Sequence, residues 1–234
     1  MKVLAIIPAR GGSKGIHRKN LVDVGGKPLI GWSINTALEL SNKGLIDHFI
    51  VSTDDEEIAC VAKRYGAEVP FLRPAELSSD TAKAIEYVIH AINFFKETGI
   101  DFDAVLLLQP TSPIRDVEAI AKALKEFKEC SSDSLISCYK EDYVNDLVMY
   151  IRSAEGTLTP KSSDHNKGIR RQDHGGIWIR NGSIYITKTS YIIEHNRLIC
   201  DKPHLLEMSK SDSMNLDTPE DLITLRALIC AREY

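Results

Sequence analysis

The stretch that decides the fold is VLAIIPARGGSKGIHRKN, residues 3–20. Its first six residues form a short apolar run typical of a buried β-strand, and a glycine-rich, basic loop follows at once. Glycines let backbone N–H groups approach an anion closely, and lysine and arginine neutralise its charge. The loop matches neither G-x-x-x-x-G-K-[ST] nor G-x-G-x-x-G. The pattern alone therefore leaves two interpretations, an anion-binding loop or a basic surface loop.

Length and charge narrow the class of protein. A chain of 234 residues suffices for one large α/β domain, or for a domain with a sizeable insertion. The net charge of −4 argues against nucleic acid as the main partner. Basic residues gather locally instead, in the first loop and around 167–171, which favours a small anionic ligand.

The cysteines and the apolar runs indicate a soluble protein of the cytoplasm. The five cysteines are odd in number and show no C-x-x-C spacing, so neither a disulfide framework nor a zinc site is expected. No apolar run approaches the roughly 20 residues that span a bilayer, so no membrane contact is expected. Residues 1–8 are too short for the apolar core of a signal peptide.

Strand and helix patterns alternate along the first 140 residues, which predicts an α/β fold with a mostly parallel central sheet flanked by helices. Ligands of such sheets bind beyond the carboxyl ends of the strands, where we expect loops 9–20, 52–55 and 109–115. The expected strands are 3–8, 47–51, 104–108 and 134–139, and the expected helices are 29–40, 56–65, 82–98 and 116–128.

The alternation changes from about residue 140. Strand patterns at 148–152 and 177–180 have no helix between them, so an inserted arm is expected over about 140–180. The alternation then resumes with a strand at 182–187, a short helix at 190–195 and a final helix at 219–232.

Six segments together resemble one family, the CMP-sialic acid synthetases (acylneuraminate cytidylyltransferases). In family order, from Ile7 to Leu222, they are IPARGGSKGIHRKN, IVSTDDEEIA, LRPAELSSDTA, LLLQPTSPIR, RNGSIYI and SMNLDTPEDL. The combination is most similar to bacterial enzymes for nine-carbon 2-keto acids such as sialic, legionaminic or pseudaminic acid. The resemblance implies a Rossmann-like nucleotide-diphospho-sugar transferase fold, with residues 1–234 as a single domain. It also implies a homodimer whose arm crosses to the partner.

The resemblance implies a reaction as well. The anomeric hydroxyl of an acidic sugar attacks the α-phosphorus of CTP, pyrophosphate leaves, and a CMP-sugar forms with Mg²⁺ as the required cofactor. Displacement at phosphorus requires the charge of the triphosphate to be neutralised and the leaving group to be held in line. The residue types of the first loop suit this chemistry.

By matching positions, the resemblance assigns Arg10, Lys14 and Lys19 to the phosphates as catalytic residues. It places Asn20, Arg73 and Ala82 near the nucleotide. Alternatives from the residues themselves remain open. The three cations could be solvated surface charges, Asn20 could hold the loop, and Arg73 could pair with Glu76. For Asp80 and Thr81 we favour the N-cap of the helix expected at 82–98.

The resemblance places Gln109, Arg171, Gln172 and Tyr185 near the sugar acid. An arginine suits this position because a guanidinium binds a carboxylate through two parallel hydrogen bonds. The alternative for Gln109 is a turn residue that satisfies backbone groups. His165 and His174 have no metal-ligand spacing to a third donor and are expected to be solvated.

Asp217 is the metal candidate, and it is also assigned as catalytic. Mg²⁺ needs only one or two protein carboxylates when phosphate oxygens and water complete its shell. Many members of the family have D-x-D here, whereas this chain has Asn215-Leu216-Asp217, so Asn215 is at most a weak ligand. The alternative for Asp217 is the N-cap of the final helix.

Three other functions fit the sequence less well. A cytidylyl- or guanylyltransferase acting on a sugar 1-phosphate or an eight-carbon keto acid keeps the same fold. A non-catalytic nucleotide-binding domain is disfavoured because Lys19 and Asp217 are both present. A Rossmann dehydrogenase is disfavoured because its G-x-G-x-x-G loop is missing.

Overall fold

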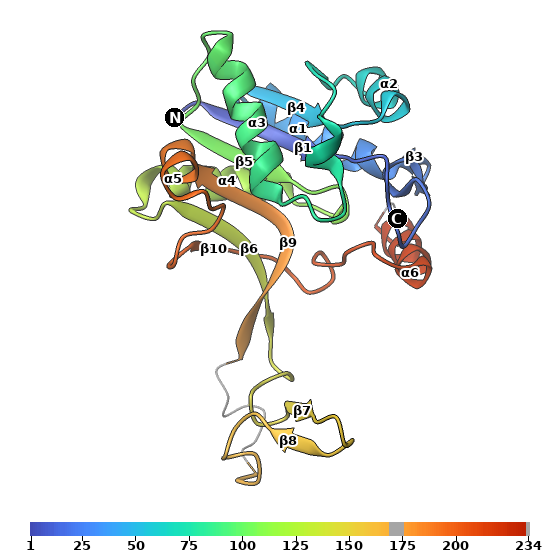
Figure 1. The fold of residues 1–234 in the computed structure, drawn as a ribbon, viewed down its shortest axis with the longest axis vertical. Coiled ribbons are helices and arrows are strands. Elements are labelled where there is room, and N and C mark those ends of the chain that lie inside the picture. Colours follow the sequence, from blue (N-terminus) through green and yellow to red (C-terminus); the bar gives the residue numbers. More distant parts are fainter. Residues whose placement is uncertain (169–175, 233–234) are drawn as a thin grey trace.

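A six-stranded sheet forms the centre of the computed structural model, which describes residues 1–168 and 176–232 (Figure 1). The strand order is β10-β6-β9-β5-β1-β4. The bounds are β1 Val3–Pro8, β4 His48–Ser52, β5 Ala104–Leu108, β6 Ser134–Glu141, β9 Ile177–Lys188 and β10 His204–Glu207. Strands β4, β1 and β5 pair in parallel, as do β6 and β10, and β9 runs antiparallel between β5 and β6. The predicted mostly parallel α/β fold is confirmed.

Strand β1 lies between β4 and β5 and is buried on both faces. Its side chains alternate, so Ala5 and Ile7 pack into one core while Leu4 and Ile6 pack into another. A parallel strand covered on both sides needs an unbroken apolar sequence, and VLAII supplies one. The glycine-rich loop, which follows this strand, therefore lies at the carboxyl edge of the sheet.

Helices cover both faces of the sheet. The helices α1 (Leu29–Asn42), α2 (Glu56–Arg64) and α4 (Val117–Glu129) bury apolar residues against one face. The helices α3 (Ala84–Glu97) and α5 (Thr189–His195) cover the other. The helix α6 (Pro219–Cys230) packs beside the β2–β3 hairpin, Asp23–Val24 and Lys27–Pro28. None of the helices in the described ranges is both long and apolar enough to cross a membrane.

The sheet differs from the prediction at its antiparallel strand. The segments expected as separate strands at 177–180 and 182–187 form one strand, β9, because β6 pairs with both parts. The register shifts between Ile136 and Cys138 of β6, opposite the part of β9 that holds Gly182, whose φ is +78°. A glycine tolerates this left-handed backbone, so the strand bends without ending. Strand β10 was not predicted.

The outer ends of β6 and β9 continue as a paired ribbon away from the body (Figure 1). A small hairpin of β7 (Tyr150–Arg152) and β8 (Leu158–Pro160) lies at the end of this ribbon. Together they form an arm. Its exposed apolar side chains are Tyr143, Val148, Tyr150, Ile151, Leu158, Ile177 and Trp178.

Two helix starts correct the sequence interpretation. Helix α3 begins after Lys83, whose backbone N–H donates to the Glu86 carboxylate at 2.9 Å, so the N-cap role predicted for Asp80 and Thr81 is wrong. Helix α6 is capped by the Thr218 hydroxyl, which accepts from the N–H of Asp221, so the capping alternative for Asp217 is wrong as well. Both aspartates are thereby free to face the neighbouring cleft. The carboxylates of Asp55 and Asp116 cap α2 and α4.

Candidate active site

A cleft of about 480 Å³ opens at the carboxyl edge of the sheet, beside the ends of β1 and β5. It is lined by the glycine-rich loop, by residues from 73 to 87, by the loop after β5 and by Asp217. Most of the side chains predicted from sequence meet here. They are Arg10, Lys14, Lys19, Asn20, Arg73, Ala82, Gln109 and Asp217.

The loop after β4 holds the glycine-rich loop in place. The N–H of Gly11 donates to Asp54 at 2.9 Å, and a Cβ at Gly11 would lie 2.6 Å from a carboxylate oxygen of Asp55. Arg18 has a left-handed φ of +51° and pairs with Asp55 at 3.0 Å and with Glu57 at 2.8 Å. Burial opposes ionisation of Asp55, but the N–H of Ile58 and the Arg18 guanidinium outweigh it and lower the pKa of this carboxyl.

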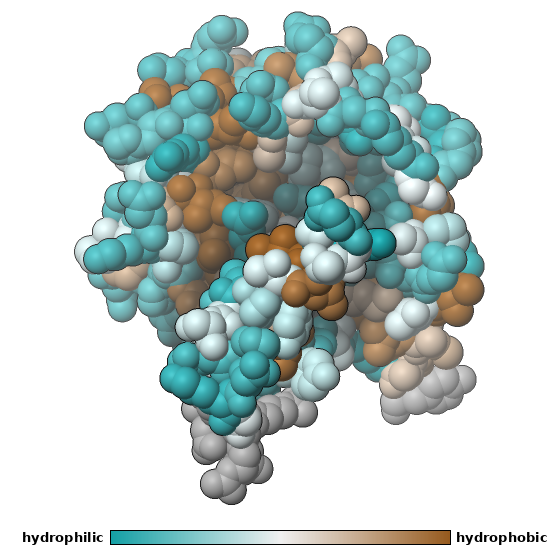
Figure 2. Space-filling view, turned by 60° about the horizontal axis from the view of Figure 1, so that its bottom comes forward, coloured by the Kyte–Doolittle hydropathy of each residue, from teal (hydrophilic) through white to brown (hydrophobic). Residues whose placement is uncertain are grey.

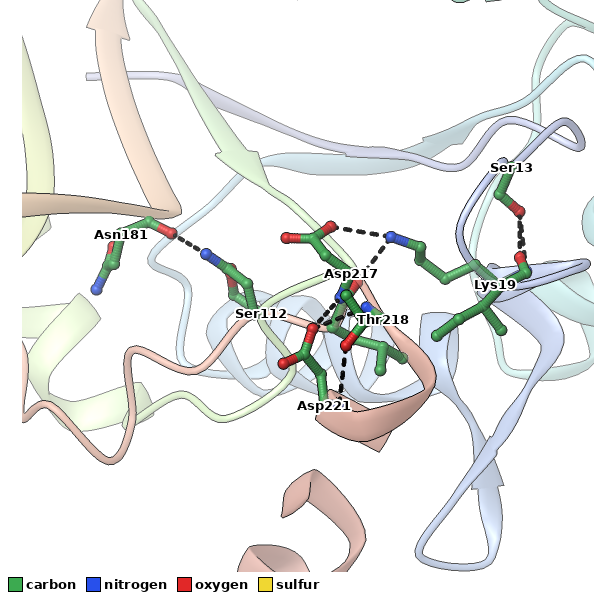
Figure 3. A network of polar contacts seen from close by, with 10 residues as sticks. Ser13, Lys19, Ser112, Asn181, Asp217, Thr218 and Asp221 are labelled. Carbon is green, nitrogen blue, oxygen red and sulfur yellow. Dashed lines mark hydrogen bonds and ion pairs between the residues drawn. The ribbon is translucent and has the colours of Figure 1, made fainter. Parts of the chain in front are cut away.

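Lys19 ties this loop to the segment before α6 (Figure 3). Its ammonium donates to the carbonyl of Leu216 at 2.7 Å and to the Asp217 carboxylate at 3.0 Å. A Cβ at Gly15 would lie 2.2 Å from the Asp217 carbonyl oxygen, so only glycine allows this approach. The Asp217 side chain is 68% exposed, which leaves its carboxylate open to a ligand in the cleft.

Asp80 bridges the two other cations of the loop. One carboxylate oxygen lies 2.9 Å from Nη1 of Arg10 and the other lies 2.8 Å from Nζ of Lys14. The hydrogen bond from Lys14, followed by that from Arg10, lowers the pKa of Asp80 below its ordinary value. Arg73 also lines the cleft, so four cations face two carboxylates, Asp80 and Asp217, and the cleft keeps a local excess of positive charge.

Two residues predicted near the nucleotide also have structural partners. Asn20 is buried and donates to the carbonyl of Arg10 at 2.9 Å, so it does hold the loop. Arg73 is buried, donates to the Ser52 hydroxyl at 3.0 Å and lies 4.5 Å from the centre of the Tyr87 ring. Burial lowers the pKa of Arg73 and raises that of Tyr87 to about 12. No ion pair joins Arg73 to Glu76 in the described part of the chain, and nucleotide contact by Asn20 and Arg73 stays a prediction.

Gln109 stands at the end of β5 and is fixed through its backbone. The Arg115 guanidinium donates to the carbonyl oxygen of Gln109. It also donates to the carbonyl oxygen of Ser183 at 3.3 Å and to the Ser33 hydroxyl at 2.9 Å. Burial lowers the pKa of Arg115 to about 9, so the guanidinium stays charged at neutral pH. These bonds join the end of β5 to the middle of its neighbour β9 and leave Gln109 in the lining of the cleft.

Tyr185, which was also predicted to lie near the sugar acid, does not line this cleft. Tyr185 is half-buried on β9, opposite Leu107, and packs with Tyr87 on the α3 face of the sheet. Burial raises its pKa. Arg171, Gln172 and His174 lie outside the described residues. His165 is on the arm, where its ring contacts Tyr150.

Asn215 links the loop after β5 to strand β9 and is not among the residues that line the cleft. Its amide nitrogen donates to the carbonyl of Asn181 at 2.9 Å, and its amide oxygen accepts from the Ser112 hydroxyl. The Asn181 side chain continues the network to Ser137 and Ser213. This geometry favours a positioning role over the weak metal role predicted for Asn215. Within residues 1–168 and 176–232, no cluster of three or more His, Cys, Asp or Glu side chains could hold a metal.

Sequence reasoning missed Asp80, Tyr87 and Arg115. The string Ser79-Asp80-Thr81 has the composition of a helix cap, and only the position of Arg10 and Lys14 shows its other use. Tyr87 could have been suspected because it follows the first turn of the helix next to the predicted nucleotide residues. Arg115 gave no comparable signal, since its partners are backbone carbonyls and a serine.

Comparison with known proteins agrees with this geometry. The family profile described as "Cytidylyltransferase" matches residues 4–203. The chain belongs to the cytidylyltransferase family. It is 39% identical over 223 residues to the CMP-N,N'-diacetyllegionaminic acid synthase of Legionella pneumophila, covering 94% of this chain and 93% of that one. The resemblance inferred from the six segments is confirmed.

Two further relatives extend the comparison. The pseudaminic acid cytidylyltransferase of Campylobacter jejuni is 34% identical over 213 residues, covering 86% of this chain and 90% of that one. The solved structure of a CMP:2-keto-3-deoxy-manno-octonic acid synthetase complexed with CTP superposes with a TM-score of 0.71 and covers 100% of both chains. At 17% identity, that likeness supports the fold alone.

The Asp55–Arg18 pair yields a stability prediction. Asp55→Asn retains a good N-cap but loses the ion pair, so we expect a loss of about 1 kcal/mol in unfolding free energy at pH 7. Because the folded pKa of Asp55 is lowered, its contribution is complete above the unfolded value near 3.8 and declines as pH falls through the folded value. The difference between the two proteins should therefore shrink in acid. Urea unfolding at pH 7 and in a pH series down to 3 measures it.

Asp116→Asn is the matched control, because Asp116 caps α4 through the N–H of Glu118 and has no ion pair among the described residues. It should change stability by a few tenths of a kcal/mol. Equal losses for both variants would contradict the role of the Arg18 pair.

Proposed function

We propose that this protein transfers CMP from CTP to the anomeric hydroxyl of a nine-carbon 2-keto sugar acid, with release of pyrophosphate. The observation that carries the proposal is the convergence of Arg10, Lys14 and Lys19 on one cleft beside the Asp217 carboxylate. Relatives at 39% and 34% identity are named as synthases for legionaminic and pseudaminic acid derivatives, which are acids of this class.

In the proposed reaction, the three cations neutralise the triphosphate and hold pyrophosphate as it leaves. Electrostatic stabilisation of this kind is the main resource of a phosphoryl-transfer site, because charge builds on the oxygens around phosphorus. Asn20, Arg73 and Ala82 line the same cleft as these cations and are proposed to face the nucleoside. Gln109 and Tyr185 are proposed to serve the acceptor, together with Arg171 and Gln172.

Mg²⁺ is the proposed cofactor, and Asp217 is the residue that would hold it. An exposed carboxylate beside the phosphate-binding cations suits an ion that completes its shell with phosphate oxygens and water. When bound, the ion supplies additional neutralisation of phosphate charge. The other carboxylate of the cleft, Asp80, already bridges Arg10 and Lys14, whereas Asn215 positions the segment that bears Asp217.

Pyrophosphate release tests the reaction directly. We expect turnover with CTP over GTP, and with a panel of nine-carbon acids, legionaminic acid derivatives first, over eight-carbon acids and sugar 1-phosphates. Lys19→Met should lower kcat/KM by about 100- to 1,000-fold, since removal of a transition-state charge contact has effects of this size. Lys122→Met, which removes an exposed lysine from α4, is the matched control.

A folded Lys19→Met enzyme with normal kcat/KM would refute the phosphate assignment. Preference for GTP or for a sugar 1-phosphate would replace the proposed substrates with those of a related transferase.

The Mg²⁺ proposal predicts a dependence on nucleotide. Because one protein carboxylate binds Mg²⁺ weakly, the ion should give little heat when titrated into the free protein and bind well only with CTP. Asp217→Asn should remove this CTP-dependent binding and almost all activity. Isothermal titration of Mg²⁺ with and without CTP measures the first effect independently of turnover.

Glu220→Gln is the control for charge, because Glu220 is exposed on the first turn of α6, close to Asp217 in the chain. Strong Mg²⁺ binding without nucleotide, or an Asp217→Asn protein with unchanged titrations, would remove Asp217 from the metal site.

The arm is the proposed dimerisation element, and residues 1–234 with an insertion at about 140–180 are proposed as one domain. Exposed apolar side chains gather on the arm, which Figure 2 shows projecting from the body. Such exposure on a projecting ribbon favours burial against another copy. The five free cysteines favour the cytoplasm as the compartment.

We expect the protein to run as a dimer in light scattering and Ile151→Lys with Leu158→Lys to yield a monomer. Ile193→Lys, at an exposed apolar position on α5, should leave the dimer intact. A double arm variant that remains dimeric would contradict the role of the arm.

A further inference from the structure

Asp80 lies in the proposed phosphate site without belonging to the catalytic residues described above. We propose that its carboxylate acts as a built-in competitor for the anion, so that a ligand reaches Arg10 and Lys14 only by displacing it. Asp80 would thereby set a charge threshold that a polyphosphate passes and a single phosphate does not. This inference rests on the proposed function, because it concerns the same cations.

The geometry resembles that of a bound anion. The two carboxylate oxygens contact different cations, one at 2.9 Å from Arg10 and the other at 2.8 Å from Lys14. A phosphate group presents its oxygens to arginine and lysine in a comparable way. Asp80 therefore occupies the place of ligand oxygens and also keeps two like charges directed into the cleft.

The position of Asp80 in the chain allows its carboxylate to move away from Arg10 and Lys14. It lies between the short 3₁₀ helix η2 (Ala75–Ser78) and the start of α3, and it caps neither. Within the described residues, its carboxylate has only these two cations as partners, and its side chain is 46% exposed. Asp55 is different, because its carboxylate also caps α2 and is mostly buried against Arg18. The Asp80 bridge can open without disrupting a helix end.

The two ion pairs of Asp80 are weak enough for an anion to displace the carboxylate. Exposed ion pairs each change an equilibrium by a factor of about 1.7 to 5.5, so two of them oppose anion binding by roughly 3- to 30-fold. A triphosphate or pyrophosphate brings several charges and also engages Lys19, so it overcomes this factor. Inorganic phosphate lacks the reach and the charge to replace both pairs and contact Lys19 together.

Asp80→Asn removes the competing charge with little change in shape. The free variant should bind inorganic pyrophosphate about 3- to 30-fold more tightly than the wild type. Its affinity for inorganic phosphate should rise by a similar factor, because the same bridge opposes both anions. Glu76→Gln is the matched control, since it removes the same charge four residues earlier, at an exposed position without contact to Arg10 or Lys14.

Calorimetric titration of inorganic pyrophosphate and inorganic phosphate, without Mg²⁺ and at fixed ionic strength, tests the inference. Tighter pyrophosphate binding in Asp80→Asn, and again in Asp80→Ser, with no gain in Glu76→Gln supports it. Equal or weaker binding in either Asp80 variant, or the same gain in Glu76→Gln, overturns it. Asp80→Ser also preserves the test if the asparagine variant folds poorly.

A parallel CTP turnover assay of the wild type separates this inference from the proposed function. Normal turnover without a gain in Asp80→Asn refutes the competitor and leaves the function intact. A gain in pyrophosphate affinity without CTP turnover supports the competitor and refutes the function.

Discussion

The contact of Lys19 with the 216–217 segment is the interaction on which the candidate site depends. Lys19 ends the glycine-rich loop, whereas Leu216 and Asp217 precede the last helix. Apart from the single 3₁₀ turn that begins at Lys19 (Lys19–Leu21), neither segment has regular structure, so each takes its shape from what it packs against. Leu216 is fully buried in a small core with Val24, Leu29, Leu225 and Ile229, which docks α6 beside the first hairpin. The lysine then closes the contact, and the absence of a side chain at Gly15 makes room for it.

The arginines of the site fall into two classes, and the division follows burial. Arg73 and Arg115 are enclosed, their pKa values are lowered by burial, and they donate to carbonyl and hydroxyl oxygens. A buried cation held in this way fixes backbone and is costly to disturb. Arg10 is partly exposed and is matched by the mobile charge of a carboxylate, Asp80. Water still screens that pair, so a ligand can replace it at small cost. The buried arginines therefore shape the cleft, and the exposed cations are left for the anion.

Sequence periodicity predicted much of this arrangement, because most helices and central strands bury apolar residues that recur at regular spacing. The apolar run at 104–108 is β5 itself, and loops 9–20 and 109–115 meet where parallel strands predict. The errors lie where partners distant in the chain decide the outcome. Gly182 suggests a break, yet pairing with β6 carries β9 through it. Asp80 suits a cap locally, yet Arg10 and Lys14 bind it. The residues next to Gly182 and Asp80 in the sequence do not include these partners.

The base of the arm and the proposed metal residue belong to one hydrogen-bonded network. Asn181 stands where β9 passes from the arm into the central sheet, and it is 4% exposed. Its carbonyl accepts from Asn215, two residues before Asp217, and its side chain bonds Ser137 of β6 and Ser213. Since buried polar groups are costly to leave unpaired, these bonds hold β6, β9 and the 213–217 segment at fixed spacing. The base of the arm and the segment that bears Asp217 therefore share one set of buried hydrogen bonds. An amide at 215 suits this network because it both donates and accepts, whereas a carboxylate only accepts.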